Sequence, residues 1–316
     1  MKVTIYEQAD ALPTLPEGNF FHSRELMEIC EQTPRHKPYM AVATDDDGQA
    51  VAHLLAIMRM RGSWIPPYLY TQIRIYGDNN CKAELFGAMI EALTERLSNK
   101  TLYIEISHLS EKMFGYRQLR HCGFFPVRWM NIHNSLHSRT PEERISPRLM
   151  RQIEHAKERG VVAKEVETSD EFNEFSRLLH HHNWLKPRRY IPHDALFKGM
   201  MACKRCKILT TWFRDHLIGA TVYVYSGKDA YLWYSASRRK SFAPLHPHAV
   251  TVWETIKDVH ANGYEHIRFM DVGLPFRKNP YRDFILRFGG KETTTYRWFR
   301  ISIKWVNKLA SWLWRE

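Results

Sequence analysis

The chain has 316 residues, of which 44% are hydrophobic and 13% aromatic, and this composition predicts a globular protein of about two domains. Its 46 lysines and arginines against 34 acidic residues give a formal net charge of +12, which favours polyanionic partners such as RNA, phosphorylated sugars or an anionic membrane surface. No long apolar stretch and no signal-peptide pattern is present, and the five cysteines are scattered, so we expect a cytoplasmic protein with reduced thiols.

The first half of the chain has the pattern of a mixed α/β domain. The expected elements, in order, are a helix at 23–31, strands at 39–43 and 50–58, a helix at 83–98 and a strand at 102–106. The turn sequence Asp45–Gly48 predicts that the first two strands form a hairpin. A short helix, a glycine turn and a last strand follow, and Pro66 and Pro67 interrupt the sheet pattern before the long helix.

A break at Thr140 and Pro141 separates the two halves. The sequence from Ser146 predicts a basic helix that ends at Gly160. We therefore expect an N-terminal domain at 1–143, a C-terminal domain at 144–300 and a tail at 301–316.

The second half contains the clearest set of elements. They are strands at 217–225 and 230–236, a helix at 249–260 and a strand at 266–270. Ser226–Asp229 is a turn sequence, so the first two strands should pair as a hairpin, and Pro247 and Gly263 suit the two ends of the helix. Thr168 and Glu171 form a capping-box pair that predicts a further helix before the hairpin.

The two halves repeat the same order of elements. Four pairs of positions correspond, Asp47 with Asp215, Ala83 with Pro247, Ile104 with Phe269 and Tyr116 with Tyr281, at offsets of 168, 164, 165 and 165 residues. This indicates one α/β unit used twice, although any two α/β halves share some element order.

The order of motifs from 140 to 301 resembles that of the FemABX group of peptidyl and aminoacyl transferases. The resemblance is carried by the linker helix SPRLMRQIEHAKERG, the strand LWYSAS, the helix around Trp253, the strand IRFMDVG and the run YRDFILRFGGKETTTYRWFRI. It implies an α/β fold of two tandem GNAT-like domains, each with a mixed, mainly antiparallel sheet flanked by helices. In one respect the chain departs from the family, because Ile285 stands where a lysine is common; Arg282 or Arg287 would then take over phosphate binding.

Family membership further implies an acyltransferase that forms an amide bond. Its acyl donor is a co-substrate rather than a tightly bound cofactor, either an aminoacyl-tRNA or, in broader relatives, acetyl-coenzyme A. The acceptor is an amine on a cell-wall (peptidoglycan) or surface-polysaccharide precursor that is phosphorylated or lipid-linked. The chain has no heptad stretch for the coiled-coil arm that some members use with tRNA.

Amide formation needs a positioned amine, donors for the oxyanion and a relay for the amine proton. In a GNAT-like fold the pocket opens between the strands at 230–236 and 266–270. We therefore predict Asp271 as the proton relay, with Tyr234 as a second candidate, and Ser235 as a substrate contact. The alternative for Asp271 is a turn-capping role.

Basic residues occur in two stretches of the sequence near this expected pocket. The candidates for phosphate contacts are Arg238, Arg239, Lys240 and His246, together with Lys186, Arg188 and Arg189 beside Trp184. The alternative is that these side chains form an ordinary solvated surface. The loop at 237–248 has no glycine, so we expect it not to wrap the pyrophosphate of coenzyme A in the usual GNAT manner.

Several other chemistries are excluded by their missing motifs. Cys203 and Cys206 form a lone pair without a second pair at ligand spacing, so we expect no metal site. The chain also lacks a nucleophile elbow, a Walker loop and a dinucleotide-binding glycine motif.

The tail at 301–316 predicts an amphipathic helix with tryptophans on one side and lysines on the other. This is the pattern of an anchor that lies on a membrane surface, and packing onto the protein's own core is the alternative. The complete hypothesis is a cytoplasmic Fem-type N-acyltransferase, with peripheral contact to the inner face of the membrane as a further expectation from the tail. The alternatives are a coenzyme A-dependent N-acetyltransferase for an amino sugar and a non-catalytic RNA- or precursor-binding module.

Overall fold

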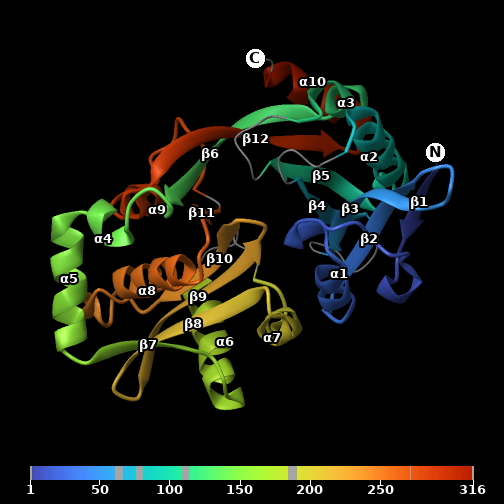
Figure 1. Ribbon diagram of the computed structural model, residues 1–316. Coiled ribbons are helices and arrows are strands. Elements are labelled where there is room, and N and C mark those ends of the chain that lie inside the picture. The colour runs from blue at the N-terminus through green and yellow to red at the C-terminus, as the bar shows by residue number, and fades with distance from the viewer. Residues whose placement is uncertain are drawn as a thin grey trace. The chain divides into compact units, whose positions relative to one another are not determined.

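The computed structural model describes residues 2–60, 67–75, 81–108, 114–183, 191–270 and 272–314. The chain forms two compact units, one made of Met1–Met130 and Thr294–Glu316 and the other of Asn131–Thr293. Figure 1 labels their helices and strands in chain order. The boundaries between the two units fall within two long strands, β6 (Phe125–Ser135) and β12 (Lys291–Ile301). Each strand contributes residues to both units.

The first unit contains the elements expected in the first half and several more. Its elements are β1 (Lys2–Tyr6), η1 (Ala9–Ala11), η2 (Phe20–His22), α1 (Arg24–Glu31), β2 (His36–Thr44), β3 (Ala50–Arg59), β4 (Tyr68–Ile75), α2 (Ala83–Leu97), β5 (Thr101–His108), α3 (Tyr116–His121) and α10 (Lys304–Leu313). Its strands follow the order β1-β2-β3-β4-β5-β12. Among the strand residues that the structure describes in this unit, only β4 and β5 are seen to pair in parallel, and the helix α2 connects them.

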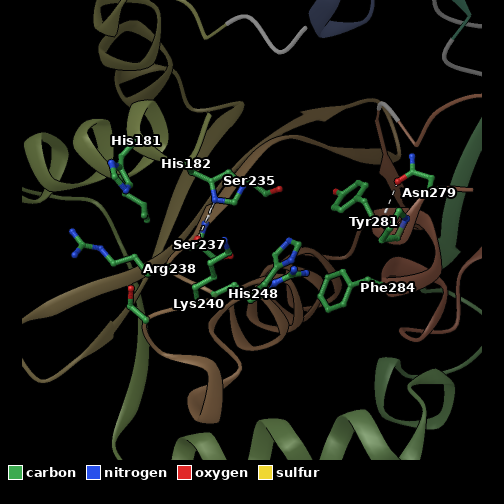
Figure 2. Close-up of a pocket in the computed structure, with 14 residues that line it drawn as sticks. His181, His182, Ser235, Ser237, Arg238, Lys240, His248, Asn279, Tyr281 and Phe284 are labelled. Atoms are coloured by element: carbon green, nitrogen blue, oxygen red, sulfur yellow. Dashed lines mark hydrogen bonds between the residues drawn. The ribbon is translucent and has the colours of Figure 1, made fainter. Parts of the chain in front are cut away.

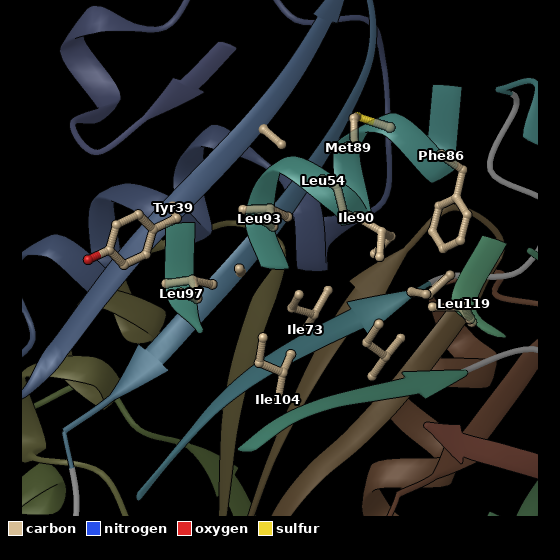
Figure 3. Close-up of a cluster of buried hydrophobic side chains, with 14 of the residues drawn as sticks. Tyr39, Leu54, Ile73, Phe86, Met89, Ile90, Leu93, Leu97, Ile104 and Leu119 are labelled. Atoms are coloured by element: carbon tan, nitrogen blue, oxygen red, sulfur yellow. The ribbon is translucent and has the colours of Figure 1, made fainter. Parts of the chain in front are cut away.

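One face of α2 forms the core of the first unit. This helix, expected at 83–98, buries an apolar stripe against strands β2 to β5 (Figure 3). Its buried members are Phe86, Met89, Ile90, Leu93 and Leu97. Burying one such side chain stabilises the fold by about 1.5–3 kcal/mol, so this stripe fixes the helix on the sheet.

The second unit repeats the plan. Its elements are α4 (Pro141–Arg144), α5 (Pro147–Glu158), β7 (Val161–Glu165), α6 (Ser169–Asn183), α7 (Asp194–Ala202), β8 (Cys206–Phe213), β9 (His216–Ser226), β10 (Asp229–Ser237), η3 (Ala243–Leu245), α8 (Pro247–Ala261), β11 (His266–Phe269) and α9 (Pro280–Leu286). The strand order is β6-β11-β10-β9-β8-β7. Within the described part of this unit, only β10 and β11 pair in parallel, and α8 connects them as α2 connects β4 and β5. The predicted tandem fold of mixed, mainly antiparallel sheets is therefore confirmed.

A close approach between α8 and the sheet sets the position of the α8 N-terminus. Gly219 of β9 lies under this helix, where a Cβ atom would come within 2.1 Å of the Thr251 Oγ1 atom. The two helix threonines bond to threonines of the sheet, Thr251 to Thr211 at 2.8 Å and Thr255 to Thr221 at 2.7 Å. Because these bonds are buried, they hold the first turns of α8 firmly against β8 and β9.

Candidate functional site

The strand β10 extends beyond the end of its shorter parallel partner β11. Their pairing runs from Asp229 and His266 as far as Leu232 and Phe269. The register of β10 against β9 shifts at the next residue, which marks a bulge, and β10 continues to Ser237. A bulge bends its strand locally, and bulges are common beside binding sites.

A cavity of about 910 Å³ lies at the end of β10 that follows this bulge, within the second unit. Figure 2 shows the side chains that line it, which come from α6, the end of β10, the loop after it and the helices α8 and α9. The lining residues are Leu178, His181, His182, Ser235, Ser237, Arg238, Arg239, Lys240, Ser241, His248, Asn279, Pro280, Tyr281 and Phe284. A cavity of this size with several polar groups is a default candidate for a binding site.

The cationic side of the cavity is formed by the loop after β10. Arg238, Arg239 and Lys240 are exposed and line the cavity, as does the predicted substrate contact Ser235. The N-terminus of α8, which carries the positive end of the helix dipole, begins a few residues later. The loop and the helix end together favour an anionic ligand.

His182, at the end of α6, is a candidate base. Its Nδ1 atom lies 3.0 Å from the Ser237 carbonyl oxygen and 3.3 Å from the Ser237 amide nitrogen (Figure 2). A carbonyl can only accept, so the shorter contact favours a proton on Nδ1 and makes Nε2 the basic nitrogen. A neutral imidazole held in this way can take a proton from a reacting amine.

Aromatic rings form a further part of the cavity lining. His248, in the first turn of α8, stacks on Phe284 with ring centroids 4.3 Å apart and on Tyr281 at 5.9 Å. Asn279 caps α9 by accepting a hydrogen bond from the Tyr281 amide, and its side chain donates to the Val272 carbonyl oxygen. Asn279 therefore ties the aromatic rings of α9 to the segment that follows β11.

Two of the predicted polar residues lie close to the cavity without lining it. Tyr234 packs edge-on against Phe197 of α7, with ring centroids 5.1 Å apart, and it stacks on Trp233. His246 is the N-cap of α8, with a left-handed backbone at φ 42°. Burial, helped by the positive charge of Arg287, lowers the pKa of His246.

The two arginines expected to replace the family lysine have other partners. The Arg282 guanidinium donates to the carbonyl oxygens of Leu274 and Arg277, which holds the loop before α9. Arg287 donates to the Gln152 side chain on α5 at 3.1 Å. Ile285 itself is fully buried in α9, so the position of the family lysine is here an apolar packing position.

Four predicted residues cannot be placed. Asp271, the expected proton relay, and the basic residues Lys186, Arg188 and Arg189 lie outside the described residues. The residues that sequence reasoning missed are His181, His182, His248, Asn279, Tyr281 and Phe284. The signal for the first two is the run of three histidines, His180–His182, which comes shortly before the predicted basic residues Lys186, Arg188 and Arg189.

The tail forms the helix α10, whose described residues include none that is buried. Four large apolar side chains are at least half exposed, Trp305 at 70%, Leu309 at 50%, Trp312 at 60% and Leu313 at 64%. Asn307 holds the helix in place, since its side chain accepts from the Ile301 amide and donates to the Gly123 carbonyl oxygen. Among the described helices, none is both long and apolar enough to cross a bilayer.

Comparisons with known proteins agree with this architecture. Residues 145–278 match the family model described as "Acetyltransferase (GNAT) domain", which includes β10, the basic loop and α8. No curated protein sequence matches the chain.

Solved structures of similar fold cover nearly the whole chain. FemX superposes with a TM-score of 0.68 at 11% identity, over 98% of this chain and 100% of FemX. L-PGS from Bacillus licheniformis has a TM-score of 0.61 at 10% identity, over 95% of this chain and 94% of that one. A tandem GNAT protein from the clavulanic acid biosynthesis pathway has a TM-score of 0.57 at 9% identity, over 95% of this chain and 99% of that protein's chain. The chain therefore has the tandem GNAT fold, in agreement with the resemblance to the FemABX group.

Proposed function

We propose that this GNAT-type acyltransferase transfers an aminoacyl group from a charged tRNA to an amine on a cell-wall or surface-polysaccharide precursor. The observation that carries the proposal is the cationic cavity at the end of β10, where Arg238, Arg239 and Lys240 meet the N-terminus of α8. Three cations on an open loop suit phosphates spread along a chain, as in the acceptor end of a tRNA.

The cavity also carries groups suited to the rest of the reaction. The rings of His248, Tyr281 and Phe284 can stack on a nucleobase, a contact that tolerates any base. In the transfer step the acceptor amine attacks the ester carbonyl, its proton passes to Nε2 of His182, and the C–O bond to the ribose breaks. The released ribose oxygen takes up a proton, and an amide remains on the acceptor.

The test is a transfer assay with two donors. The protein is mixed with tRNA charged with radiolabelled amino acids and, separately, with labelled acetyl-coenzyme A, each with a UDP-linked muropeptide or an amino sugar as acceptor. We expect label on the muropeptide from charged tRNA, and loss of that label when the tRNA is deacylated beforehand. Transfer from acetyl-coenzyme A alone would overturn the proposal.

A thioester-dependent N-acetyltransferase acting on an amino sugar is the second candidate. It is favoured by the description of the family model that matches residues 145–278. The same assay distinguishes it, because its product would carry acetyl label and would not require RNA. Binding of charged tRNA without transfer to any acceptor would instead support a non-catalytic binding module.

We propose in addition that α10 rests on the surface of an anionic membrane, where a lipid-linked acceptor would be found. Its exposed tryptophans and leucines supply apolar area, and Lys304 and Lys308 on the same helix supply positive charge. This combination is typical of helices that lie in the interfacial plane of a bilayer. A peripheral position of this kind requires no spanning helix.

Replacing Trp305 and Trp312 together by alanine is expected to reduce sedimentation with phosphatidylglycerol vesicles by about fivefold or more, because the helix loses most of its apolar contact. The double substitution leaves Asn307 and its two hydrogen bonds in place, which truncation would remove. Phe276→Ala is the matched control, since Phe276 is 70% exposed but lies outside α10. Equal sedimentation of the double variant and the wild type would refute membrane contact through this helix.

A further inference from the structure

A second group of chemically active side chains lies at the opposite end of β10 from the cavity. His137, Glu265 and His266 each offer a metal-ligand atom, and these three atoms lie within 4.8 Å of one another. Asp229, the first residue of β10, borders the group through His266, whereas the cavity is lined by Ser235 and Ser237. At the rise of a strand, the two sites are roughly 20 Å apart.

The backbone under this cluster is fixed by the pairing of β6 and β11. His266 lies opposite Ser135 in the antiparallel register. The Glu265 carbonyl oxygen accepts a hydrogen bond of 2.7 Å from the Leu136 amide, which continues the pairing beyond the strands. The two histidines and the glutamate therefore sit on a rigid two-stranded base, which a metal site requires.

The hydrogen bonds of both imidazoles favour a metal-binding tautomer. The Nδ1 atom of His266 lies 3.0 Å from Oδ1 of Asp229, and Nδ1 of His137 lies 3.4 Å from the Glu265 carbonyl oxygen and 3.3 Å from the Ser135 hydroxyl. A carboxylate and a carbonyl both accept, so a proton on each Nδ1 leaves the lone pair on Nε2. A histidine that bonds a carboxylate through its second nitrogen is the common arrangement around protein-bound metals.

We propose that His137, Glu265 and His266 bind a divalent transition metal ion, zinc above all, with Asp229 orienting the His266 ring. Two imidazoles and one carboxylate suit zinc, cobalt or nickel, whereas magnesium and calcium prefer oxygen ligands alone. Three protein ligands leave further positions of the ion to water. The bound ion joins the end of β6, which comes from the first half of the chain, to the start of β11.

One contact competes with the metal. The Lys228 ammonium lies 2.6 Å from Oε1 of Glu265 and neutralises the carboxylate, and this bond lowers the pKa of Glu265. The Lys228 side chain is 78% exposed, so it can move into solvent when a metal ion binds. Removing its charge is therefore expected to strengthen metal binding, a result that a merely structural cluster would not give.

Isothermal calorimetry with zinc chloride on the full chain tests the site. We expect one ion per chain with a dissociation constant in the micromolar range, and no heat from magnesium chloride. His137→Ala is the main variant, because His137 is exposed and its loss should leave the fold intact, as a thermal melt would verify. It should weaken zinc binding at least about tenfold, and Asp229→Asn by about 10- to 100-fold.

Three further variants make the result specific. His260→Ala removes an exposed histidine from the end of α8 and should leave zinc binding unchanged, as should Cys203→Ser. Lys228→Ala should tighten binding severalfold. The site is disproved if the wild type binds zinc no more tightly than His137→Ala, or if His260→Ala or Cys203→Ser removes the binding.

Discussion

Replacing His182 by alanine is expected to lower the turnover number for acyl transfer by about 10²-fold or more, with little change in the Michaelis constant of either substrate. The reason is that His182 lines the cavity and its Nδ1 atom lies at hydrogen-bond distance from the Ser237 carbonyl oxygen, which orients the ring. A proton relay acts in the transition state and adds little to the binding of the ground state. The measurement is steady-state transfer of labelled amino acid with each substrate varied in turn.

His181→Ala is the matched control for this variant. His181 is the preceding residue of α6 and also lines the cavity, but it is exposed. It should lose far less activity than the His182 variant. Added imidazole should restore part of the rate of His182→Ala, which a purely structural role would not allow. A turnover number within about threefold of the wild type would remove His182 from the mechanism.

The parts of the fold that sequence predicted well are those set by local chemistry. In the second unit, Pro247 begins α8 and Gly263, at φ 78°, lies just beyond its end, as their conformational preferences require. The hairpin of β9 and β10 is joined at Ser226 and Asp229 through a turn whose Gly227 has φ 59°. In each case the signal and the structure lie within a few residues of one another.

Strands whose pattern is obscured were missed. The strand β4 follows Pro66 and Pro67 and buries polar side chains, among them Gln72 and Arg74, so it lacks the alternation of a half-buried strand. The strand β7 is a short edge strand of which only Val161 is buried. Because most of its side chains are not buried, its sequence lacks the alternation of apolar and polar residues by which a half-buried strand is predicted.

The division of β6 and β12 between the two units could not be predicted from neighbouring residues in the sequence. Ile132 of β6 pairs with Phe269 of β11, and Ile106 of β5 pairs with Trp298 of β12. These contacts join residues more than a hundred positions apart, and no residue type marks them. The candidate site has the same character, since its lining comes from four separate segments. The sequence predicts the loop at 238–240 as part of the site because its charged residues are adjacent, whereas it gives no such signal for the aromatic rings of α9.

Acetyl-coenzyme A is expected to bind the wild-type protein no more tightly than about 1 mM, or some −4 kcal/mol. A pyrophosphate cradle needs backbone N–H groups that are unengaged and a chain that can approach closely. In the loop after β10, the amides of Arg238, Phe242, Leu245 and His246 already donate to backbone carbonyl oxygens. Pro244 and Pro247 have no N–H, and the loop contains no glycine.

The same loop should be essential for the binding of tRNA through its side chains. Replacing Arg238, Arg239 and Lys240 together by alanine is expected to weaken the binding of charged tRNA at least about tenfold. The magnitude of the slope of log affinity against log salt concentration should fall by about two. The control removes three exposed arginines of the linker region, Arg148, Arg151 and Arg159, and so makes the same change in net charge. Calorimetry with acetyl-coenzyme A and filter binding with charged tRNA provide the two measurements. A micromolar dissociation constant for acetyl-coenzyme A, abolished by the loop variant but not by the control, would make the loop a thioester site and favour the N-acetyltransferase.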